Sequence, residues 1–397
     1  MPRAVIVDIV RSPFAKGRQS GALADAHPVD LFAQVLRALV DRTGIDPHLI
    51  DDVIAGCVLQ VAEQSGNVAR QAALAAGLPE SVPGVSLDRK CGSAQQALDF
   101  AAQGIIAGAY DFAIAGGVEM MSRVPMRANR MGKDNLGPLF HERYREGLVH
   151  QGISAELIAA KWQLSRTEQD AYAVRSHARA AAFEDAGHSQ KDIIPIRIES
   201  EHGEARIVTS DEGIRRETSL EGLAALTPSF ADEALSARFP EIDWGVTAGN
   251  ASQVTDGATA ILLASEAAAA RYNLTPRAAV THFAVTGDDP ILMLTGIIPA
   301  TEKLLARAGI GLAHIDRFEV NEAFASVVLA WLKETGADPA CVNAHGGAIA
   351  LGHPVGASGG RLTANLIRGL EISDGTLGLQ TMCESGGMAN ATLFERL

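Results

Sequence analysis

Residues 346–360 read GGAIALGHPVGASGG, a glycine-rich segment built around one histidine, His353. So many glycines indicate a backbone that passes close to another group or takes positive φ angles that side chains disfavour. Pro354 then fixes the chain just before the start of a helix. A histidine in this setting can act as a general base towards a thiol or donate a hydrogen bond to a carbonyl oxygen.

Two other interpretations of this segment are disfavoured by its spacing. A phosphate-binding loop would carry GxxxxGK[ST], or GxGxxG between a strand and a helix, and neither pattern is present. A metal pair of His345 and His353 would be a poor ligand set, because the histidines are widely spaced and no carboxylate lies nearby. We therefore predict a catalytic His353 and no metal site.

The segment has a counterpart in the first half of the chain, which indicates a duplicated fold. CGSAQQAL (91–98) resembles VGASGGRL (355–362), IDD (50–52) resembles IDR (315–317), and AGGVEMM (115–121) resembles SGGMANA (385–391). Short apolar runs predict strands at 53–57, 111–117, 317–320 and 377–383, and helical spacing predicts helices at 92–108, 323–335 and 356–370. The repeat predicts two βαβ-rich domains related by a pseudo-twofold axis.

The middle of the chain differs in character from both halves. It contains polar helices predicted at 154–162 and 167–184, and the charged stretch DEGIRRETSLEG (211–222). A long insertion between β-rich halves is more often a functional lid than a linker. We predict an N-terminal domain of residues 1–121 plus 245–270, an inserted covering loop domain of residues 122–244, and a C-terminal domain of residues 271–397.

The composition excludes several classes of protein. The chain of 397 residues is 47% apolar but only 5% aromatic and has 39 glycines, as expected for tightly packed α/β layers. Its 34 basic and 47 acidic residues give a net charge of −13, which disfavours nucleic acid but not a phosphorylated ligand bound by a local cluster of arginines. The absence of a secretory or peroxisomal signal and of a long apolar run predicts a cytoplasmic protein without a membrane span.

The four cysteines, Cys57, Cys91, Cys341 and Cys383, form no CxxC pair, so zinc-finger and thioredoxin interpretations have no support. Cys91 lies in LDRKCGSAQQAL, between an extended segment and a predicted helix. A helix N-terminus stabilises a thiolate, so we expect the Cys91 thiolate to be populated near neutral pH. From this context alone, a reactive thiol and a buried filler remain equally acceptable interpretations.

Two further segments carry candidate polar groups. TMCESGGMAN (381–390) places Cys383 at a strand end before glycines, which predicts an exposed position. VNEAFA (320–325) places Asn321 and Glu322 between a strand and a helix, where their side chains can cap the helix or hold a water.

Together these segments resemble the thiolases, the acyl-CoA:CoA C-acyltransferases. The resemblance spans the chain and rests on the Cys91 segment, AGGVEMMS (115–122), GNASQVTDGA (249–258), NEAF (321–324), GGAIALGHPVGASGGR (346–361) and the Cys383 strand end. It implies an α/β fold of duplicated domains packed as five layers, α-β-α-β-α, with helices between two sheets and the inserted loop domain as a cover. It also implies a homodimer or homotetramer that needs no cofactor and uses coenzyme A as co-substrate.

The resemblance implies roles for the matching residues. Cys91 would be the acylated nucleophile, His353 would take its proton, and Cys383 would be the acid/base at the acetyl α-carbon. One oxyanion hole would come from His353 and a water held by Asn321. The other would use the backbone N–H groups of Cys91 and Ser385, a type of contribution that is often the largest single catalytic term.

Three further residues would contact the coenzyme A moiety, by the same resemblance. They are Ser252 and the arginines of the insertion, Arg215 and Arg216. The planar guanidinium forms paired charge-assisted bonds with phosphate, which suits this role. The alternative for the arginine pair is an exposed, solvated pair of charges.

The sequence also departs from the family pattern. Ser385 stands where the family usually has glycine, His345 where it has asparagine, and Ile297 where it has proline, while Gln151 replaces the methionine typical of acetoacetyl-specific members. These changes favour a degradative 3-ketoacyl-CoA thiolase of fatty acid β-oxidation. The alternative is an acetoacetyl-CoA-specific biosynthetic thiolase.

Other classes fit less well. A ketoacyl synthase would pair its cysteine with two histidines, or with a histidine and an asparagine, and Cys383 argues against this. A non-catalytic acyl-CoA-binding relative would be expected to lose a catalytic residue, and none is missing. A nicotinamide dehydrogenase would carry a glycine fingerprint that the sequence lacks.

Overall fold

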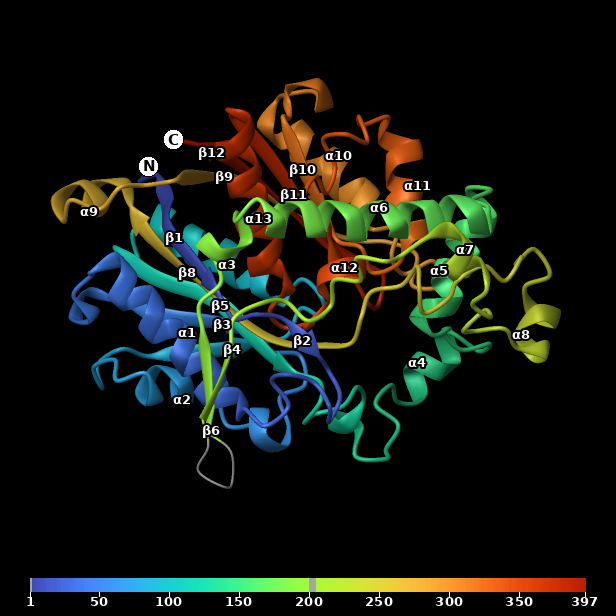
Figure 1. Ribbon diagram of the computed structural model, residues 1–397, viewed down its shortest axis with the longest axis horizontal. Coiled ribbons are helices and arrows are strands. Elements are labelled where there is room, and N and C mark those ends of the chain that lie inside the picture. The colour runs from blue at the N-terminus through green and yellow to red at the C-terminus, as the bar shows by residue number, and fades with distance from the viewer. Residues whose placement is uncertain (1, 200–204) are drawn as a thin grey trace.

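Ten strands form one mixed sheet in the computed structural model, which describes residues 2–199 and 205–397 (Figure 1). The strands are β1 (Ala4–Arg11), β2 (Ala15–Lys16), β3 (Asp52–Gly56), β4 (Gly84–Leu87), β5 (Phe112–Met120), β8 (Thr255–Ser265), β9 (Ala278–Gly287), β10 (Arg317–Val320), β11 (Leu377–Glu384) and β12 (Met388–Arg396). Their order is β10-β11-β12-β9-β1-β8-β5-β3-β4, and β2 pairs with β8. A separate hairpin joins β6 (Ile196–Glu199) and β7 (Ala205–Val208).

The two halves of the sheet repeat one topology. The order β3-β5-β8-β1 in the first half matches β10-β11-β12-β9 in the second. In each half the first pairing is parallel and the next two are antiparallel. Val342 forms a parallel bridge with Phe318 of β10, as β4 does with β3. The duplicated α/β fold predicted from the sequence is therefore confirmed.

The halves are joined by a short antiparallel pairing of β1 with β9. It consists of Ala4–Val280, Val5–Ala279 and Ile6–Ala278. We predicted two sheets, and at this seam they are continuous. Without this pairing, β1 and β9 would be edge strands with unpaired backbone N–H and C=O groups. The pairing provides hydrogen-bond partners for these groups.

Helices enclose the two halves as five layers. On the outer face of the first half lie α1 (Pro28–Thr43) and α2 (Val68–Ala75), and on that of the second half lie α10 (Ile297–Ala308) and α11 (Ala325–Thr335). Between the halves lie α3 (Ser93–Ile106) and α13 (Ser358–Ser373), which contact strands of both (Figure 1). The order is α-β-α-β-α, as predicted.

Small residues permit the close packing of this central layer. Ala94, Ala97 and Ala101 of α3 are fully buried. Gly359 of α13 approaches so closely that an added Cβ would lie 2.3 Å from the backbone nitrogen of Gln95. The alanine- and glycine-rich composition is thus explained by helices that must fit between two β-layers.

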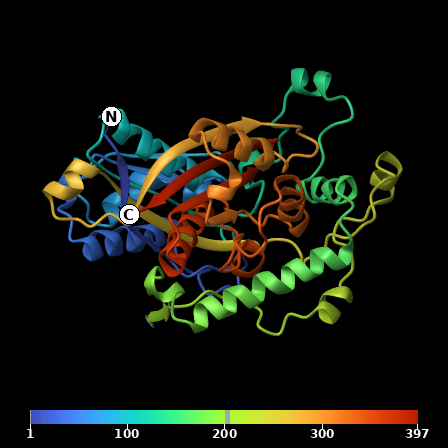
Figure 2. The same ribbon diagram turned by 90° about the horizontal axis from the view of Figure 1, so that it is seen from above.

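The insertion contributes α4 (Pro138–Arg143), α5 (Gln151–Lys161), α6 (Arg166–Asp185), α7 (Leu220–Ala224) and α8 (Glu233–Arg238). α5 packs against α11, while α6 packs against α11 and α12 (Ala348–Leu351). In Figures 1 and 2, α8 lies at the end of the molecule away from both termini. Residues 152–159 of α5 are buried, so part of the insertion belongs to the packed body. The division into three domains stays a prediction.

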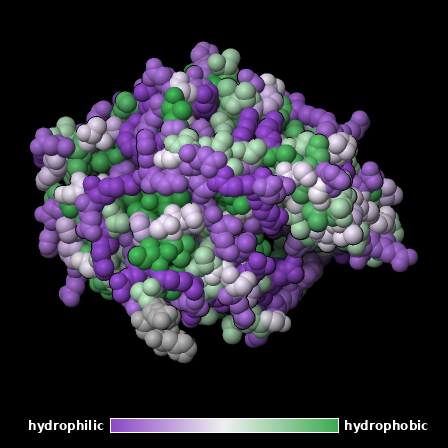
Figure 3. Space-filling model, in the orientation of Figure 1, coloured by the Kyte–Doolittle hydropathy of each residue, from purple (hydrophilic) through white to green (hydrophobic). Residues whose placement is uncertain are grey.

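The remaining elements are short. α9 spans Glu266–Arg271, and one-turn 3₁₀ helices span Pro47–Leu49, Ala62–Gln64, Ala128–Arg130, Ser189–Lys191 and Leu312–His314. No helix within residues 2–199 and 205–397 combines the length and apolar character needed to cross a bilayer. Hydrophilic residues predominate on the face shown in Figure 3, between small apolar groups.

One predicted strand boundary is wrong. We expected a strand that ends at Gly117, yet β5 continues to Met120 with Gly116 and Gly117 inside it. A Cβ at Gly117 would lie 2.1 Å from the carbonyl oxygen of Gly356, so glycine here allows close packing rather than a turn. The glycines Gly386 and Gly387 do form a turn with positive φ, and the two Gly-Gly pairs are not structural equivalents.

A buried ion pair ties the insertion to β1. Both terminal nitrogens of Arg11 donate to the Asp211 carboxylate at 2.7 Å, and the backbone N–H of Phe14 donates to the same carboxylate at 2.8 Å. Both charged side chains are almost fully buried, at 3% and 1% exposure. The interaction links residues 200 positions apart in the sequence.

Asp211→Asn should lower the free energy of unfolding by about 3–5 kcal/mol, because it leaves the Arg11 charge buried without its counterion. Urea denaturation measures the change. Glu199→Gln is the matched control, since the Arg197–Glu199 pair is 65% exposed on both sides and should contribute at most about 1 kcal/mol. Equal losses in the two variants would contradict a stabilising role for the buried pair.

Candidate active site

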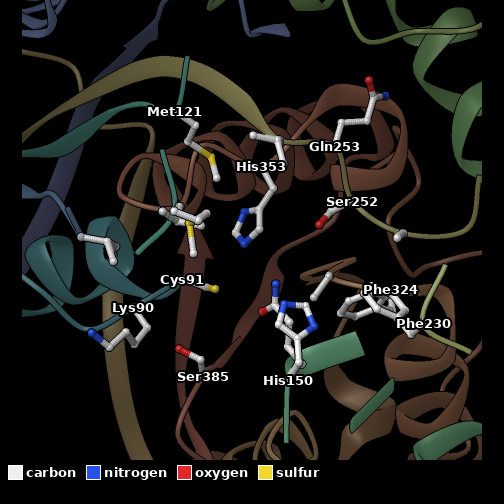
Figure 4. Close-up of a pocket in the computed structure, with 17 residues that line it drawn as sticks. Lys90, Cys91, Met121, His150, Phe230, Ser252, Gln253, Phe324, His353 and Ser385 are labelled. Atoms are coloured by element: carbon white, nitrogen blue, oxygen red, sulfur yellow. The ribbon is translucent and has the colours of Figure 1, made fainter. Parts of the chain in front are cut away.

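Loops from both halves and from the insertion meet at a cavity of about 290 Å³. Among the predicted site residues, Cys91, Ser252, His353 and Ser385 line it (Figure 4). The other residues in its wall are Val58, Lys90, Met121, Met126, His150, Gln151, Phe230, Ala251, Gln253, Val254, Ala323, Phe324 and Val355. The structure therefore brings together residues that are separated by nearly 300 positions in the sequence.

Cys91 lies in a tight turn that leads into α3. Lys90, immediately before it, has a positive φ of 50°, a conformation that non-glycine residues adopt only when the surroundings enforce it. The hydroxyl of Ser93 accepts a hydrogen bond from the N–H of Arg89 at 2.9 Å and donates to the carbonyl of Lys90 at 2.6 Å. These bonds fix the turn and direct the sulfur into the cavity, between His353 and Ser385 (Figure 4).

The resting Cys91 group is a neutral thiol. Burial raises its pKa, and negative charge on Cys383 or Glu384 raises it further. The backbone N–H groups of Ser385 and of Cys91 itself lower the pKa, but desolvation outweighs them. Our expectation of a thiolate populated near neutral pH is therefore wrong, because the sequence does not reveal how deeply the helix start is buried. Formation of the thiolate requires a base.

His353 is suited to be that base. Burial lowers its pKa to about 3, with a further contribution from the Arg361 charge, so the ring is neutral at neutral pH. Its Nδ1 lies 2.6 Å from Oγ of Ser358, whose hydroxyl donates to the carbonyl of Pro354. The hydroxyl hydrogen of Ser358 is thus engaged by the Pro354 carbonyl. Nδ1 of His353 must therefore carry the ring proton, and Nε2 must be the acceptor. Nε2 is buried without a hydrogen-bond partner among the described residues.

Cys383 and Asn321 lie just behind the cavity wall. Nδ2 of Asn321 donates to Sγ of Cys383 at 3.7 Å, and Oδ1 of Asn321 is buried without a partner in the described part of the chain. Burial raises the pKa of Cys383 to about 11, although the Asn321 hydrogen bond opposes the shift. Our prediction of an exposed Cys383 is wrong, since β11 extends one residue beyond it and the side chain is fully buried. The water-holding role predicted for Asn321 stays a prediction.

The backbone N–H of Ser385 faces the Cys91 sulfur, as the predicted oxyanion hole requires. Its side chain also lines the cavity. The position is reached by a residue with a Cβ because the positive φ angles of the turn fall on Gly386 and Gly387. Both N–H groups of the predicted hole are thus directed at one point, and their catalytic role stays a prediction.

The structure brings together two of the three predicted coenzyme A contacts, Ser252 and Arg215, and places Arg216 elsewhere. Ser252 lines both the cavity and an adjoining hollow of about 380 Å³, whose wall includes Lys16, Arg18 and Arg215. The backbone N–H of Arg215 donates to Nδ1 of His177 at 3.0 Å, which fixes the loop. Arg216 instead pairs with Glu184 and Asp185 on α6, and it lines neither hollow.

Glu322 forms a buried hydrogen-bond network that the sequence did not predict. Its carboxylate accepts from the hydroxyls of Tyr172 at 2.8 Å and Ser176 at 2.7 Å, both on α6. It also accepts from Nδ2 of Asn343 at 3.2 Å and from the N–H of Ile349 at 3.1 Å. One side chain thus connects the insertion, the segment that follows β10 and the glycine-rich segment that carries His353.

An apolar wall of the cavity was also missed. Phe230 lies between the rings of His150 and Phe324, with ring centroids 5.4 Å and 6.2 Å away. Met126 also lines the cavity, and Met121 lies across it from Phe230 (Figure 4). These residues come from irregular segments and follow no helical or strand periodicity. Gln151 gave the only signal, because the family resemblance places it where acetoacetyl-specific members tend to have methionine.

The buried neutral His353 predicts a defined pH dependence of stability. Its folded-state pKa of about 3 is below its ordinary value of 6.5, so the unfolded chain binds the extra proton between these limits. The contribution is present above pH 6.5 and is lost as the pH falls towards 3. The free energy of unfolding should therefore fall less steeply with acidification in His353→Asn than in the wild type, as measured by denaturant titrations across this range. Parallel curves would contradict the assignment, because His177 and His345 contribute equally to both proteins.

Comparison with known proteins agrees with the geometry. The N-terminal domain of thiolase matches residues 4–267, and the C-terminal domain of thiolase matches residues 274–396. Steroid 3-ketoacyl-CoA thiolase FadA6 of Mycobacterium tuberculosis is 48% identical over 100% of this chain and 95% of its own length. A 3-ketoacyl-CoA thiolase of Yersinia pestis is 42% identical over 100% of both. The crystal structure of Bacillus anthracis acetyl-CoA acetyltransferase superposes with a TM-score of 0.89 at 36% identity, covering 100% of this chain and 99% of that one. The chain belongs to the thiolase family.

Proposed function

We propose that this protein cleaves 3-ketoacyl-CoA with coenzyme A, in a reversible Claisen reaction that passes through an acyl group on Cys91. The chain is an acyltransferase of the thiolase family. The observation that carries the proposed mechanism is the state of His353, a neutral base with a free Nε2 in the same cavity as a neutral thiol. Coenzyme A is the co-substrate in this proposal, and we expect no resident cofactor.

In the first half of the reaction, Nε2 of His353 takes the Cys91 proton and the sulfur attacks the 3-keto carbon. The bond between C2 and C3 then breaks, which leaves the shortened acyl group on Cys91. The thiol of Cys383 gives its proton to C2, so acetyl-CoA leaves. In this proposal His353 and a water held by Asn321 stabilise the negative charge on one carbonyl oxygen, and the backbone N–H groups of Cys91 and Ser385 stabilise that on the other.

In the second half, coenzyme A regenerates the enzyme. Its thiol gives its proton to the Cys383 thiolate and attacks the acyl carbon on Cys91. The Cys91 sulfur departs and recovers its proton from the imidazolium of His353. Protons and charges balance over the two halves without an added acid or base.

The substrate class follows from the two hollows and the relatives. The apolar side of the cavity, with Phe230, Phe324 and Met126, fits an acyl chain, and the adjoining hollow with Lys16, Arg18 and Arg215 fits the phosphates of coenzyme A. Relatives named 3-ketoacyl-CoA thiolase, one of them steroid 3-ketoacyl-CoA thiolase, favour a degradative enzyme. Comparing kcat/KM for acetoacetyl-CoA and for longer or bulkier 3-ketoacyl-CoA separates this proposal from the biosynthetic alternative. A cytoplasmic location and a homodimer or homotetramer stay predictions.

Replacing the two cysteines separates their roles. Cys91→Ala should abolish the covalent acyl-enzyme, because no second thiol lines the cavity among the described residues. Cys383→Ala should still be acylated by an activated acyl donor, yet its thiolysis rate should fall by about 10²–10⁴, the usual loss for a positioned acid/base. Intact-mass spectrometry detects the acyl-enzyme, and coupled assays measure thiolysis. Near-normal thiolysis by Cys383→Ala would overturn the division of roles.

Neighbouring arginines provide a matched pair for the coenzyme A site. Arg215→Ala should raise KM for coenzyme A by about tenfold, since a charged hydrogen bond contributes on the order of 1.5–3 kcal/mol. Arg216→Ala should leave KM within about twofold, because its guanidinium pairs with Glu184 and Asp185 outside both hollows. Steady-state kinetics at saturating acyl substrate measures both. A larger effect at Arg216 would mean that the loop rearranges when the ligand binds.

A further inference from the structure

A buried carboxyl group without a hydrogen-bond partner lies directly beneath the turn that carries Cys91. Glu384 is the last residue of β11, follows Cys383 in the chain, and is fully buried. Neither Oε1 nor Oε2 has a partner among the described residues. Buried acceptors without donors are rare in folded proteins, so both oxygens require an explanation.

The carboxyl group contacts the turn at Gly92. A Cβ added to Gly92 would lie 2.1 Å from Oε1 of Glu384 and 2.9 Å from Nδ2 of Asn390. Nδ2 of Asn390 donates to the carbonyl of Gly92 at 3.1 Å, while Oδ1 of Asn390 is another buried acceptor without a partner. Two side chains with unsatisfied oxygens thus meet at the residue that follows Cys91.

One proton reduces the deficit. If Glu384 is protonated, its O–H becomes a donor in a region where three buried oxygens, Oε1 and Oε2 of Glu384 and Oδ1 of Asn390, have no partner among the described residues. If Glu384 is ionised, the site holds a buried negative charge and all three acceptors stay unpaired, the arrangement that costs most in a protein interior. The neutral form therefore fits the geometry and the ionised form does not.

We infer that Glu384 is a positioning residue that works as a neutral acid, holding the Cys91 turn through Asn390, and that its ionisation opposes the formation of the Cys91 thiolate. The inference rests on the proposed function only in taking Cys91 as the nucleophile. It assigns to this side chain a role distinct from those of Cys383 and His353, which exchange protons with the reactants.

The charges around Glu384 support the neutral state. Burial raises its pKa to about 8, the Arg89 charge opposes the shift, and Asp99 and Asp88 add to it. Lys90 neutralises part of the Asp88 charge through a 2.6 Å ion pair. The ionisable groups that face the carboxyl are Asp88, Arg89 and Cys91 on the turn, Asp99 on α3 and Cys383 on β11.

The same electrostatics connect Glu384 to the nucleophile. Negative charge on Glu384 is one of the causes that raise the pKa of Cys91. Ionisation of Glu384 near pH 8 therefore makes the Cys91 thiolate still harder to form above that pH. An enzyme whose Glu384 cannot ionise escapes this penalty.

Glu384→Gln tests the inference, because the amide keeps the shape and can still donate to Asn390 but cannot ionise. The rate of Cys91 carbamidomethylation by iodoacetamide, mapped by mass spectrometry, should respond differently to pH in the two proteins. The ratio of the variant rate to the wild-type rate should rise through about pH 8 to about tenfold, the change that accompanies a shift of one pKa unit. A ratio that is constant across this range would overturn the inference.

Asp99→Asn is the control for the same buried region. The pKa of Asp99 is also raised to about 8, but this carboxyl accepts from Thr392 and does not contact the Cys91 turn. Because the Asp99 charge adds to the upward shift of the Glu384 pKa, Asp99→Asn should move the suppression of Cys91 alkylation to lower pH without abolishing it. A profile that changes in Asp99→Asn and not in Glu384→Gln would assign the effect to Asp99 and overturn the inference.

Infrared difference spectroscopy supplies a readout that is independent of Cys91. The wild-type spectrum near pH 7 should contain the C=O stretch of a neutral carboxylic acid that is absent from Glu384→Gln, and this band should disappear above about pH 8. Its absence at pH 7 would overturn the inference even if the proposed function holds. If Glu384→Gln does not fold, Glu384→Met, also unable to ionise, should show the same rise in the alkylation ratio, and a flat ratio there would equally overturn it.

Discussion

The active site depends on one buried carboxylate, that of Glu322. Its four hydrogen bonds come from α6, from Asn343 and from the loop before His353. Glu322 directly follows Asn321, whose amide contacts Cys383. The carboxylate thus sets the relative positions of the insertion, the base and the second cysteine. A fully satisfied polar network of this kind specifies one arrangement where apolar packing would permit several.

Burial determines the chemistry that these residues can perform. Cys91, Cys383 and His353 are all held in their neutral forms by desolvation. Charge therefore appears only when a proton moves between partners, and it appears next to N–H groups that are already in place. In a site of this kind the dipoles that stabilise developing charge are fixed in advance, so they need not reorganise as the reaction proceeds.

The duplicated fold and the Cys91 and His353 segments of the cavity could be predicted from the sequence because they rest on local patterns, whereas the apolar wall around Phe230 could not. Helix and strand periodicity located the repeated units, and the segments around Cys91 and His353 carry distinctive spacing. Properties that depend on how deeply a side chain is buried could not be predicted from the sequence. The extension of β5 past two glycines, the burial of Cys383 and the neutral thiol of Cys91 follow from close packing between segments far apart in the sequence. Arg215 lines a hollow whereas Arg216 pairs with acidic residues of α6, and no local sequence pattern reveals these acidic partners.

The internal repeat has a consequence for the composition of the site. Cys91 and Val355 occupy corresponding positions before α3 and α13, and both line the same cavity. The pseudo-symmetric architecture thus presents two equivalent places for a thiol, of which only one is used, while the other repeat supplies the histidine and the second cysteine. Two identical halves would have to place the same side chain at both positions. Because the halves differ in sequence, one supplies the thiol of Cys91 and the other supplies His353 and Cys383 around the same cavity.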